Sequence, residues 1–348
     1  MNNEKAKQRH SKNKSRRKAP VGGFFGFDRC LDLAYPGDLR TRLSRSIKLV
    51  EPELDLENWL EHPDITEQIE ILFATWNMAV MDEKFLARFP KLRAVFYAAG
   101  SVKGWATEEA FDRGIRISSA WAANAIPVAE YTLAVILLSL KRFWHHANDC
   151  RMRHVWRHQS DVPGVYSSVI GLISLGAVAR TVAWKLADHE VEVIAYDPFV
   201  SPAQAKKLGV KLLPLEEVFR RADVISLHTP WLPETENLVN ERLLRLMKPA
   251  STLINTARGA VICEPDLCRV LAERSDITAI LDVTQREPLR PDSPLWTLEN
   301  VILTPHIAGS MGNEITRMGH WMAGEGLRYT KGKPLQHEVT RPMLGRMA

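Results

Sequence analysis

Short runs of apolar residues alternate along this chain with longer segments in which apolar positions recur at helical spacing. Residues 169–173 and 191–196 are two such runs, rich in β-branched side chains, and the segment between them carries Val178, Val182 and Leu186 on one helical face. Parallel strands covered on both faces are apolar along their whole length, whereas the helices that cover them are apolar on one side. The pattern therefore predicts an α/β fold with parallel sheets.

The same alternation extends on both sides of this central unit. Before it, strands are predicted at residues 22–27, 47–50, 69–75, 92–97 and 115–118, with helices at 38–44, 82–89 and 108–113. After it, strands are predicted at 223–227, 252–255, 277–283 and 301–303, with helices at 215–222, 241–247 and 264–273. Because 348 residues exceed the usual size of one domain, we expect two domains, each built around a parallel sheet.

Two long helices are predicted outside these units. One begins near Asn124, carries Pro127 in its first turn, where proline is favoured, and continues to about Ala147. Residues 151–166 are polar and are expected to form a surface connection. The other helix, residues 313–330, is amphipathic and is expected to return to the first domain.

A glycine-containing turn joins the first central strand to its helix. The dinucleotide fingerprint is G-x-G-x-x-G/A, and Ser174, Gly176 and Ala179 occupy its three positions. Main-chain N–H groups at such a helix N-terminus can bind a pyrophosphate, and Asp197, at the end of the next strand, can accept the ribose hydroxyls. A carboxylate there repels a 2′-phosphate and no Arg follows closely, so NAD is favoured over NADP.

Two observations limit this interpretation of the turn. Ser174 replaces the glycine that makes the tight bend, which puts the affinity for a dinucleotide in doubt. Taken alone, the turn is equally compatible with an ordinary βα connection in an α/β protein. Whether this turn binds a dinucleotide must therefore be judged from the other polar residues of the chain.

Positive charge is concentrated at the start of the chain. The net charge is +5, but residues 1–20 contain eight Lys and Arg and one Glu, so the rest of the chain has a net charge of −2. The tail, residues 1–22, has few apolar residues and is expected to be disordered. It lacks aromatic residues for base stacking and the apolar core of a secretory signal. A solvated extension is therefore preferred over a contact with nucleic acid or an anionic surface.

Cysteine spacing and apolar run lengths argue against other classes of protein. Cys30, Cys150, Cys263 and Cys268 form no C-x-x-C pair and have no histidine partners at metal-binding spacing. Reduced thiols in the cytoplasm are expected. No apolar run approaches the length of a membrane span. We therefore expect no metal, no membrane and no nucleic acid as partners of the folded domains.

Residues suited to binding a ligand follow the ends of most predicted strands, where open parallel sheets bind ligands. They are Ser174, Gly176, Asp197, His228, Arg258, Asp282 and His306. Singly, Arg258 is also explained as a turn charge, Glu287 as a loop charge, and His306 as a structural histidine. Their convergence on one edge of one sheet favours a functional site.

The motifs around these residues resemble those of the D-isomer-specific 2-hydroxyacid dehydrogenase family, from about Phe24 to Leu335. They are Asn124-Ala…Val128-Ala-Glu130, the glycine turn, Tyr196-Asp-Pro198, His228-Thr-Pro230, Asn255-Thr-Ala-Arg258-Gly259, Leu281-Asp-Val283, Glu287-Pro288 and Thr304-Pro-His306. The resemblance implies an α/β protein of two Rossmann-like domains with parallel sheets. A flavodoxin-like substrate domain would comprise residues 23–123 and 310–348, and a NAD-binding Rossmann domain would comprise residues 124–309.

The resemblance also implies the site residues. The catalytic residues would be Arg258, Glu287 and His306. NAD would be bound by Ser174, Leu175, Gly176, Ala177, Val178, Asp197, His228, Thr229, Pro230, Thr256, Ala257, Arg258, Asp282 and His306, with Asp282 orienting the nicotinamide carboxamide. The substrate would contact Arg258 and the backbone N–H groups around Gly100, Ser101 and Val102, and Trp76 either lines this pocket or belongs to the core.

These residue types suit the reduction of a 2-keto acid, which needs a hydride for the carbonyl carbon and a proton for its oxygen. An imidazole can donate and accept such a proton at neutral pH, which fits His306. Glu287 would orient the ring and favour its charged form. Arg258 would hold the substrate carboxylate as a planar fork, which Lys cannot reproduce. Formate dehydrogenases of this family have Gln where this chain has Glu287, which favours a hydroxyacid substrate.

Three functions are compatible with these residues. The preferred one is a NAD-dependent D-2-hydroxyacid dehydrogenase, and the resemblance implies a cytoplasmic homodimer that uses the helix from Pro127. A corepressor-like NAD(H)-binding protein would retain the same Arg, Glu and His without useful turnover. A degenerate paralogue would bind little cofactor, as Ser174 allows. The sequence does not identify the acid.

Overall fold

The structure, a computed structural model, describes residues 18–156, 162–345 and 347. Its contacts divide the chain into two compact units. Of the described residues, the first unit holds those up to 98, together with 105–118 and 319–338, and the second holds 99–104, 119–318 and those from 339 onward. Residues 1–17 of the predicted basic tail lie outside the described residues, and the predicted tail extends too far, because Val21 and Gly22 belong to the strand Val21–Phe25. The division into units does not test the substrate-binding and NAD-binding roles that were predicted for the two domains.

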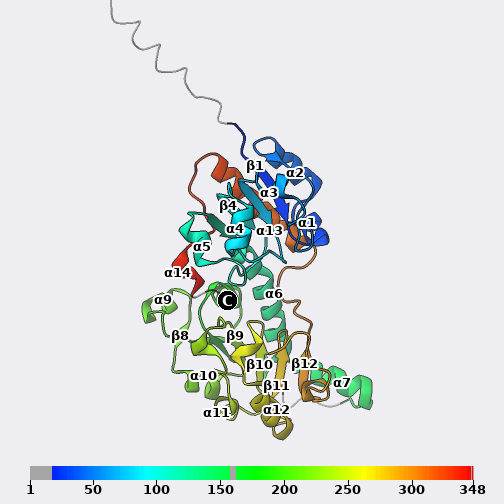
Figure 1. Cartoon of the computed structure of the whole chain (residues 1–348). Coiled ribbons are helices and arrows are strands. Elements are labelled where there is room, and N and C mark those ends of the chain that lie inside the picture. The colour runs from blue at the N-terminus through cyan, green and yellow to red at the C-terminus, as the bar shows by residue number, and fades with distance from the viewer. Residues whose placement is uncertain (1–17, 157–161, 346, 348) are drawn as a thin grey trace, which may run out of the picture. The chain divides into compact units, whose positions relative to one another are not determined.

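A six-stranded sheet forms the centre of the first unit (Figure 1). Its strand order is β13-β5-β4-β3-β1-β2, and the pairs β1–β2, β1–β3 and β3–β4 are parallel. The strands are β1 (Val21–Phe25), β2 (Lys48–Leu49), β3 (Ile71–Ala74), β4 (Ala94–Tyr97), β5 (Arg116–Ser119) and β13 (Glu338–Val339). At the outer edge, the Arg116 guanidinium donates to both oxygens of the Glu338 carboxylate, at 2.6 and 2.8 Å.

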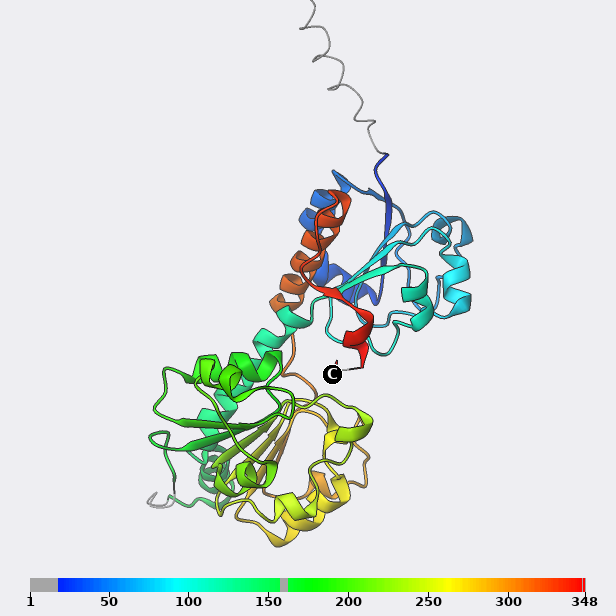
Figure 2. The ribbon, with the colours of Figure 1, turned by 90° about the vertical axis from the view of Figure 1, so that its left-hand side faces the viewer.

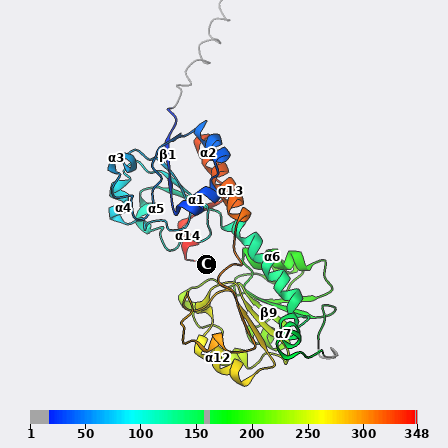
Figure 3. The ribbon, with the colours of Figure 1, turned by 90° about the vertical axis from the view of Figure 1, so that its right-hand side faces the viewer.

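Helices cover both faces of this sheet (Figure 3). On one face lie α1 (Asp28–Ala34), α2 (Gly37–Ser44) and the long α13 (Asn313–Thr330), and on the other lie α3 (Pro63–Thr66), α4 (Glu83–Arg88) and α5 (Glu108–Asp112). The helix α13 packs so closely that a Cβ on Gly326 would lie 2.6 Å from the Phe73 ring. A Cβ on Gly319 would lie 1.6 Å from the carbonyl oxygen of Ala34. Both contacts require glycine.

A seven-stranded parallel sheet forms the centre of the second unit (Figure 2). Its order is β12-β11-β10-β9-β6-β7-β8, with parallel pairing throughout. The strands are β6 (Val169–Ile173), β7 (Glu192–Tyr196), β8 (Lys211–Leu212), β9 (Val224–Leu227), β10 (Thr252–Asn255), β11 (Thr278–Leu281) and β12 (Val301–Leu303). The chain builds outward from β6 through β7 and β8, and then on the other side through β9 to β12. This doubly wound order places a switch point between β6 and β9, where such sheets bind ligands.

Helices also cover both faces of the second sheet (Figure 2). The first face carries α6 (Trp121–Ser139), α8 (Ala177–Leu186) and α9 (Pro202–Lys207), and the second carries α10 (Leu215–Arg221), α11 (Glu241–Leu244) and α12 (Glu264–Glu273). The remaining helices are α7 (Phe143–Arg153), α14 (Arg341–Leu344) and the 3₁₀ turns η1 (Pro233–Thr235), η2 (Gly259–Val261) and η3 (Pro294–Trp296). Ile170 and Leu172 pack toward the first face and Ile173 toward the second. Because both faces are covered, the strands are apolar along their whole length.

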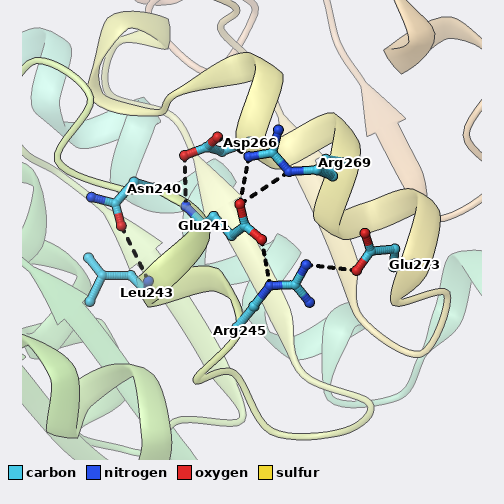
Figure 4. A network of polar contacts seen from close by, with 7 residues as sticks. All are labelled: Asn240, Glu241, Leu243, Arg245, Asp266, Arg269 and Glu273. Carbon is cyan, nitrogen blue, oxygen red and sulfur yellow. Dashed lines mark hydrogen bonds and ion pairs between the residues drawn. The ribbon is translucent and has the colours of Figure 1, made fainter.

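An ion-pair network joins α11 to α12 (Figure 4). The Glu241 carboxylate accepts hydrogen bonds from Arg245 Nε at 2.7 Å and from Arg269 Nη2 at 2.6 Å. Arg245 also donates to Glu273 at 2.7 Å, and the backbone N–H of Glu241 donates to Asp266 at 3.0 Å. The network fastens together the outer surfaces of two helices that pack on the second sheet.

The predicted single helix from Asn124 to about Ala147 is wrong. The chain forms two helices there, α6 and α7, and the break lies at Arg142, whose φ of +47° is left-handed. Because α6 begins at Trp121, Pro127 lies in the helix interior rather than in its first turn, and it has no N–H to donate to the preceding turn. The predicted connection at 151–166 overlaps α7, and residues 157–161 within it lie outside the described residues.

The helix α6 is long and apolar enough to cross a membrane, judged by length and composition alone. Its 19 residues contain an 18-residue window of mean hydropathy 1.5. The expectation that no segment approaches this length is therefore wrong for α6. Half of that window is buried inside the protein, where Ala129, Val135 and Ile136 pack with α8 and the sheet. Such packing is typical of a core helix, which passes the same test.

Candidate functional site

The turn after β6 leads directly into the N-terminus of α8. Ser174 has a left-handed backbone with φ of +72°, the conformation for which glycine is the default residue. Its N–H donates to the Tyr196 carbonyl at 2.8 Å, and its hydroxyl lies 3.1 Å from the hydroxyl of Thr229. These contacts with the ends of β7 and β9 hold the serine in a conformation that it would otherwise rarely adopt.

Gly176 is the N-cap residue of α8 and is surrounded by open space. Its φ of −73° is accessible to any residue, and a Cβ added there would meet no atom within 4 Å. By contrast, a Cβ on Gly171 inside β6 would lie 2.6 Å from Val218. Nothing in the described part of the chain therefore requires glycine at 176. The open approach to a helix N-terminus, continued by Ala177 and Val178, fits the pyrophosphate of a dinucleotide.

The Asp197 carboxylate connects the end of β7 to the turn after β6. Its Oδ2 accepts a hydrogen bond from the backbone N–H of Leu175 at 2.7 Å. Its Oδ1 accepts from the N–H groups of Phe199 at 2.8 Å and Val200 at 3.1 Å. A carboxylate offers about four lone-pair positions, so Asp197 still has capacity for one further donor.

His228 follows β9 at the switch point of the sheet. Burial lowers the pKa of its imidazole to about 3, so the ring is neutral at neutral pH. Its Nε2 is enclosed and has no hydrogen-bond partner among the described residues. The Thr229 hydroxyl donates to the Ile173 carbonyl at 3.3 Å, and Pro230 follows. Because this nitrogen is enclosed, the predicted contact of His228 with NAD stays a prediction.

The turn after β10 is held by the side chain of Asn255. Its Oδ1 accepts from the Ala257 N–H at 3.0 Å, and its Nδ2 donates to the Arg258 carbonyl at 3.0 Å. The Arg258 guanidinium donates to the Ala257 carbonyl at 2.7 Å. Burial lowers the pKa of Arg258 and the nearby charge of Glu287 raises it. A guanidinium stays protonated under such opposing influences, so the site holds a fixed positive charge.

Two further contacts position this turn. The hydroxyl of Thr256 lies 3.2 Å from that of Thr132 on α6. Gly259 packs against the backbone of Thr284, because a Cβ there would lie 1.9 Å from the Thr284 carbonyl. This close approach brings the turn of Arg258 next to the loop that carries Glu287, and it requires glycine.

His306 and Glu287 are in direct contact. His306 Nδ1 lies 2.7 Å from Glu287 Oε2, and the side chains are 51% and 41% exposed. The His306 backbone is left-handed, with φ of +54°, and its N–H donates to the Asp282 carbonyl at 2.9 Å. Because Glu287 engages Nδ1, Nε2 is the ring nitrogen left to react with another group.

The buried carboxylate of Asp282 organises the loop that carries His306. It accepts hydrogen bonds from the Thr304 hydroxyl at 2.6 Å, the Ile307 N–H at 2.8 Å and the Ala308 N–H at 2.9 Å. The Tyr131 hydroxyl on α6 lies 2.9 Å from the Thr304 hydroxyl. This positioning by Asp282 was not predicted, and its predicted contact with a nicotinamide carboxamide stays a prediction.

A cavity of about 690 Å³ lies beside Arg258 within the second unit. Its lining comprises Ser101, Lys103, Gly104, Trp231, Leu232, Pro233, Glu236 and Arg258. The loop that carries Ser101 is anchored by Ser119, whose hydroxyl donates to the Ala99 carbonyl at 2.9 Å and also to that of Gly100. Val102 is fully buried, so the loop presents Ser101 and Lys103 to the cavity.

The structure brings together part of the predicted substrate site. Ser101 and Arg258 share the cavity, and Gly100 and Val102 anchor the loop between them. Trp76 follows β3 in the first unit and is partly buried, and its predicted role stays a prediction. Trp231 and Glu236 also line the cavity and were not predicted. Trp231 directly follows the His228-Thr-Pro230 motif, which is the signal that would have found it.

The chain matches known proteins over most of its length. Residues 133–308 match the family described as D-isomer specific 2-hydroxyacid dehydrogenase, NAD binding domain. D-3-phosphoglycerate dehydrogenase of Mycobacterium leprae (strain TN) is 32% identical over 267 residues, 75% of this chain and 50% of that protein. This chain thus spans about half the length of that relative. (S)-sulfolactate dehydrogenase of Chromohalobacter salexigens is 33% identical over 258 residues, 74% of this chain and 83% of that protein.

A solved structure shows the same fold. The NAD-complexed D-isomer specific 2-hydroxyacid dehydrogenase from Lactobacillus delbrueckii ssp. bulgaricus matches 92% of this chain and 100% of its own, with a TM-score of 0.76 and 19% identity. The predicted α/β class with Rossmann-like domains is confirmed. NAD is confirmed as the cofactor, because residues 133–308 match a NAD-binding domain. The chain belongs to the D-isomer-specific 2-hydroxyacid dehydrogenase family.

Proposed function

We propose that this protein is a NAD-dependent oxidoreductase that interconverts a 2-keto acid and a D-2-hydroxy acid. The observation that carries the proposal is the 2.7 Å contact between His306 Nδ1 and Glu287 Oε2, with the charged Arg258 close to Glu287 and in the wall of a cavity. An acid–base pair and an anion-binding group are the side chains that this reaction needs. The family supports the general reaction, dehydrogenation of 2-hydroxy acids with NAD.

The chain's own residues fit the cofactor as follows. When bound, the cofactor would supply a hydride to C2 of the keto acid as NADH, or accept a hydride from C2 of the hydroxy acid as NAD⁺. Gly176 and the first N–H groups of α8 would face the pyrophosphate. Asp197, which keeps capacity for one more donor, would accept a ribose hydroxyl.

At the reacting carbon, three side chains would divide the work. In reduction, His306 would donate the proton from Nε2 to the carbonyl oxygen, and in oxidation it would take that proton back. Glu287 would accept a hydrogen bond from Nδ1–H, which fixes the ring and stabilises the imidazolium. Arg258 would bind the carboxylate and polarise the carbonyl, together with N–H groups of the loop around Ser101.

The test is NADH oxidation by the purified full chain against glyoxylate, hydroxypyruvate, pyruvate, phenylpyruvate and branched 2-keto acids. Turnover of at least one acid, with the D-hydroxy acid as product, supports the proposal. Binding of NADH without turnover of any of them contradicts it.

One observation favours a second candidate. Ser174 holds a left-handed backbone in the phosphate-binding turn, which is compatible with a cofactor-binding protein of the corepressor kind or with a weakly binding paralogue. In that case NADH binding would be the whole activity, or would be absent. The same samples measured by NADH fluorescence distinguish these two outcomes.

We also propose that the protein acts as a cytoplasmic homodimer, an assignment supported by the family resemblance. Sedimentation at micromolar concentration tests the oligomeric state. A monomeric mass at all concentrations would contradict the dimer without affecting the proposed reaction.

A further inference from the structure

The cavity beside Arg258 has an aromatic wall to which the proposed reaction assigns no role. Trp231 is 52% exposed and lines this cavity together with Leu232 and Pro233. An exposed indole in a concave site is a large apolar surface that a ligand can cover. The volume of about 690 Å³ lies in the range of pockets that enclose ligands much larger than a three-carbon acid.

Trp231 is held in place by contacts on two sides. Lys103 Nζ donates to the Trp231 carbonyl at 2.9 Å, and the indole Nε1 donates to Glu236 Oε2 at 3.5 Å. The following turn η1 is fixed by Thr235, whose hydroxyl donates to the Pro230 carbonyl at 2.6 Å. These contacts restrain the backbone of the wall and one edge of the indole ring, which reduces the entropic cost of binding against it.

Two charges of opposite sign lie at this end of the cavity. Lys103 and Glu236 both line it and carry charges of opposite sign, and Lys103 already donates to a carbonyl. In the proposed reaction, the third charge, on Arg258, is matched by the substrate carboxylate. The rest of the lining then offers no net positive charge to a second anionic group, whereas Trp231, Leu232 and Pro233 offer apolar surface.

We propose that Trp231 is a specificity-determining residue that selects 2-keto and D-2-hydroxy acids with an aromatic side chain, which packs against its indole ring. This inference rests on the proposed function. It assigns the carboxylate end of the substrate to Arg258 and the side-chain end to the wall formed by Trp231, Leu232 and Pro233.

The first experiment compares kcat/KM of the wild-type protein for phenylpyruvate, pyruvate and the phosphate-bearing acid 3-phosphohydroxypyruvate, with NADH. Burial of the phenyl ring should raise kcat/KM for phenylpyruvate roughly 10- to 100-fold over pyruvate. The difference should lie mainly in KM, because contacts remote from the reacting carbon bind substrate and transition state alike.

Two variants and one control assign the preference to the indole ring. Trp231→Ala should bring the ratio of phenylpyruvate to pyruvate toward one, and Trp231→Phe, which retains an aromatic ring, should restore most of it. Trp296→Ala is the control, since Trp296 is 56% exposed and its Nε1 donates to the Arg290 carbonyl at 2.9 Å, but it does not line the cavity. This control should leave the ratio unchanged.

The outcomes separate this inference from the proposed function. A wild-type preference for pyruvate or for the phosphate-bearing acid overturns the inference and leaves the dehydrogenase in place. The inference is also overturned if Trp231→Ala leaves the ratio of kcat/KM for phenylpyruvate to that for pyruvate unchanged. If the wild type turns over none of the acids while it binds NADH, the proposed function fails, and the inference fails with it.

Discussion

Ser174 illustrates how a single side chain can hold an unfavourable backbone conformation. A left-handed backbone costs a non-glycine residue roughly 1–2 kcal/mol, and the hydrogen bond between the hydroxyls of Ser174 and Thr229 offsets about 1 kcal/mol of that. Ser174→Gly removes both terms, so the free energy of unfolding should change by less than about 1 kcal/mol. Ser174→Ala removes only the bond and should lower it by about 1 kcal/mol.

Urea unfolding of the wild type and both variants measures this difference. NADH affinity should be preserved or improved in Ser174→Gly. If Ser174→Gly is less stable than Ser174→Ala, the serine is adapted to this turn by a contact other than its hydrogen bond to Thr229.

His228 should make the stability of the apoprotein depend on pH. Burial lowers its pKa to about 3 in the folded protein, whereas an unfolded histidine titrates near 6.5. Between these values the unfolded state binds more protons, so the free energy of unfolding falls as the pH falls from about 6.5, by at most about 1.4 kcal/mol per unit. His228→Gln should reduce this slope.

Urea midpoints measured without NAD at pH 7, 6, 5 and 4 test this prediction. His320→Gln, at an exposed position, is the control and should leave the slope unchanged. An equal slope for His228→Gln and the wild type would contradict the burial of a neutral ring.

The residues that follow the strand ends were predictable one by one, but most of their partners were not. The contact of His306 with Glu287 was expected, because the family resemblance implies that these two residues act as a pair. The use of Asp282 to bind the Ile307 and Ala308 N–H groups was not expected, because it depends on how the chain folds back after β12. A carboxylate at a strand end serves equally well as a ligand to the backbone or to a cofactor, and its residue type does not distinguish these roles.

At the scale of the elements, the two glycines of the β6–α8 unit should separate ligand binding from folding. Gly176 borders open space, so Gly176→Ala should leave Tm within a few degrees of the wild type and weaken NADH binding by steric exclusion. Gly171 packs on Val218, so Gly171→Ala should lower Tm. Thermal unfolding and NADH fluorescence measure both effects.

Each of the two glycine variants has an outcome that would contradict its prediction. If Gly176→Ala binds NADH as tightly as the wild type, the pyrophosphate does not approach this helix N-terminus. If Gly171→Ala unfolds at the wild-type temperature, the packing of β6 against α10 is looser than its close contacts indicate.

The network between α11 and α12 should stabilise the protein in a salt-dependent manner (Figure 4). Hydrogen bonds from Arg245 and then Arg269 lower the pKa of Glu241, so its stabilising contribution is present at neutral pH and is lost as the pH falls through that lowered value. Glu241→Gln should lower Tm at low salt. The difference should shrink in about 1 M NaCl, where charges are screened beyond about 3 Å.

Glu217→Gln is the matched control, because Glu217 forms an ion pair with one arginine, Arg220, on its own helix α10. Its effect on Tm should be smaller. Equal losses for the two variants would show that the link between α11 and α12 adds nothing beyond an isolated pair.

The elements themselves were largely predictable, because buried parallel strands and amphipathic helices carry different periodicities. The break between α6 and α7 was not, since it lies at Arg142, a residue with no preference for the left-handed conformation it adopts. The position of Pro127 was also predicted wrongly. Local rules place proline in the first turn of a helix, but tertiary packing keeps Pro127 inside α6.

At the scale of the whole molecule, the alternation of strands and helices predicted the parallel pairing of the second sheet, but it predicted neither the strand order nor the cavity. Lys103 and Trp231 are 128 positions apart, and their hydrogen bond lies within the second unit. Periodicity reports which face of an element is buried. It carries no information about which distant loops share a cavity.

We propose that His306, held by Glu287, is the proton donor and acceptor of a NAD-dependent dehydrogenase. The most direct measurement is NADH oxidation by the wild type and His306→Ala with the best acid of the panel, with NADH binding followed by fluorescence in the same samples. Removal of an acid–base group costs roughly 100- to 10,000-fold in rate. We predict a loss of this size with NADH affinity within about threefold of the wild type, since the loop is held by Asp282 rather than by the His306 ring. A variant that retains wild-type turnover would show that His306 is not the acid–base group.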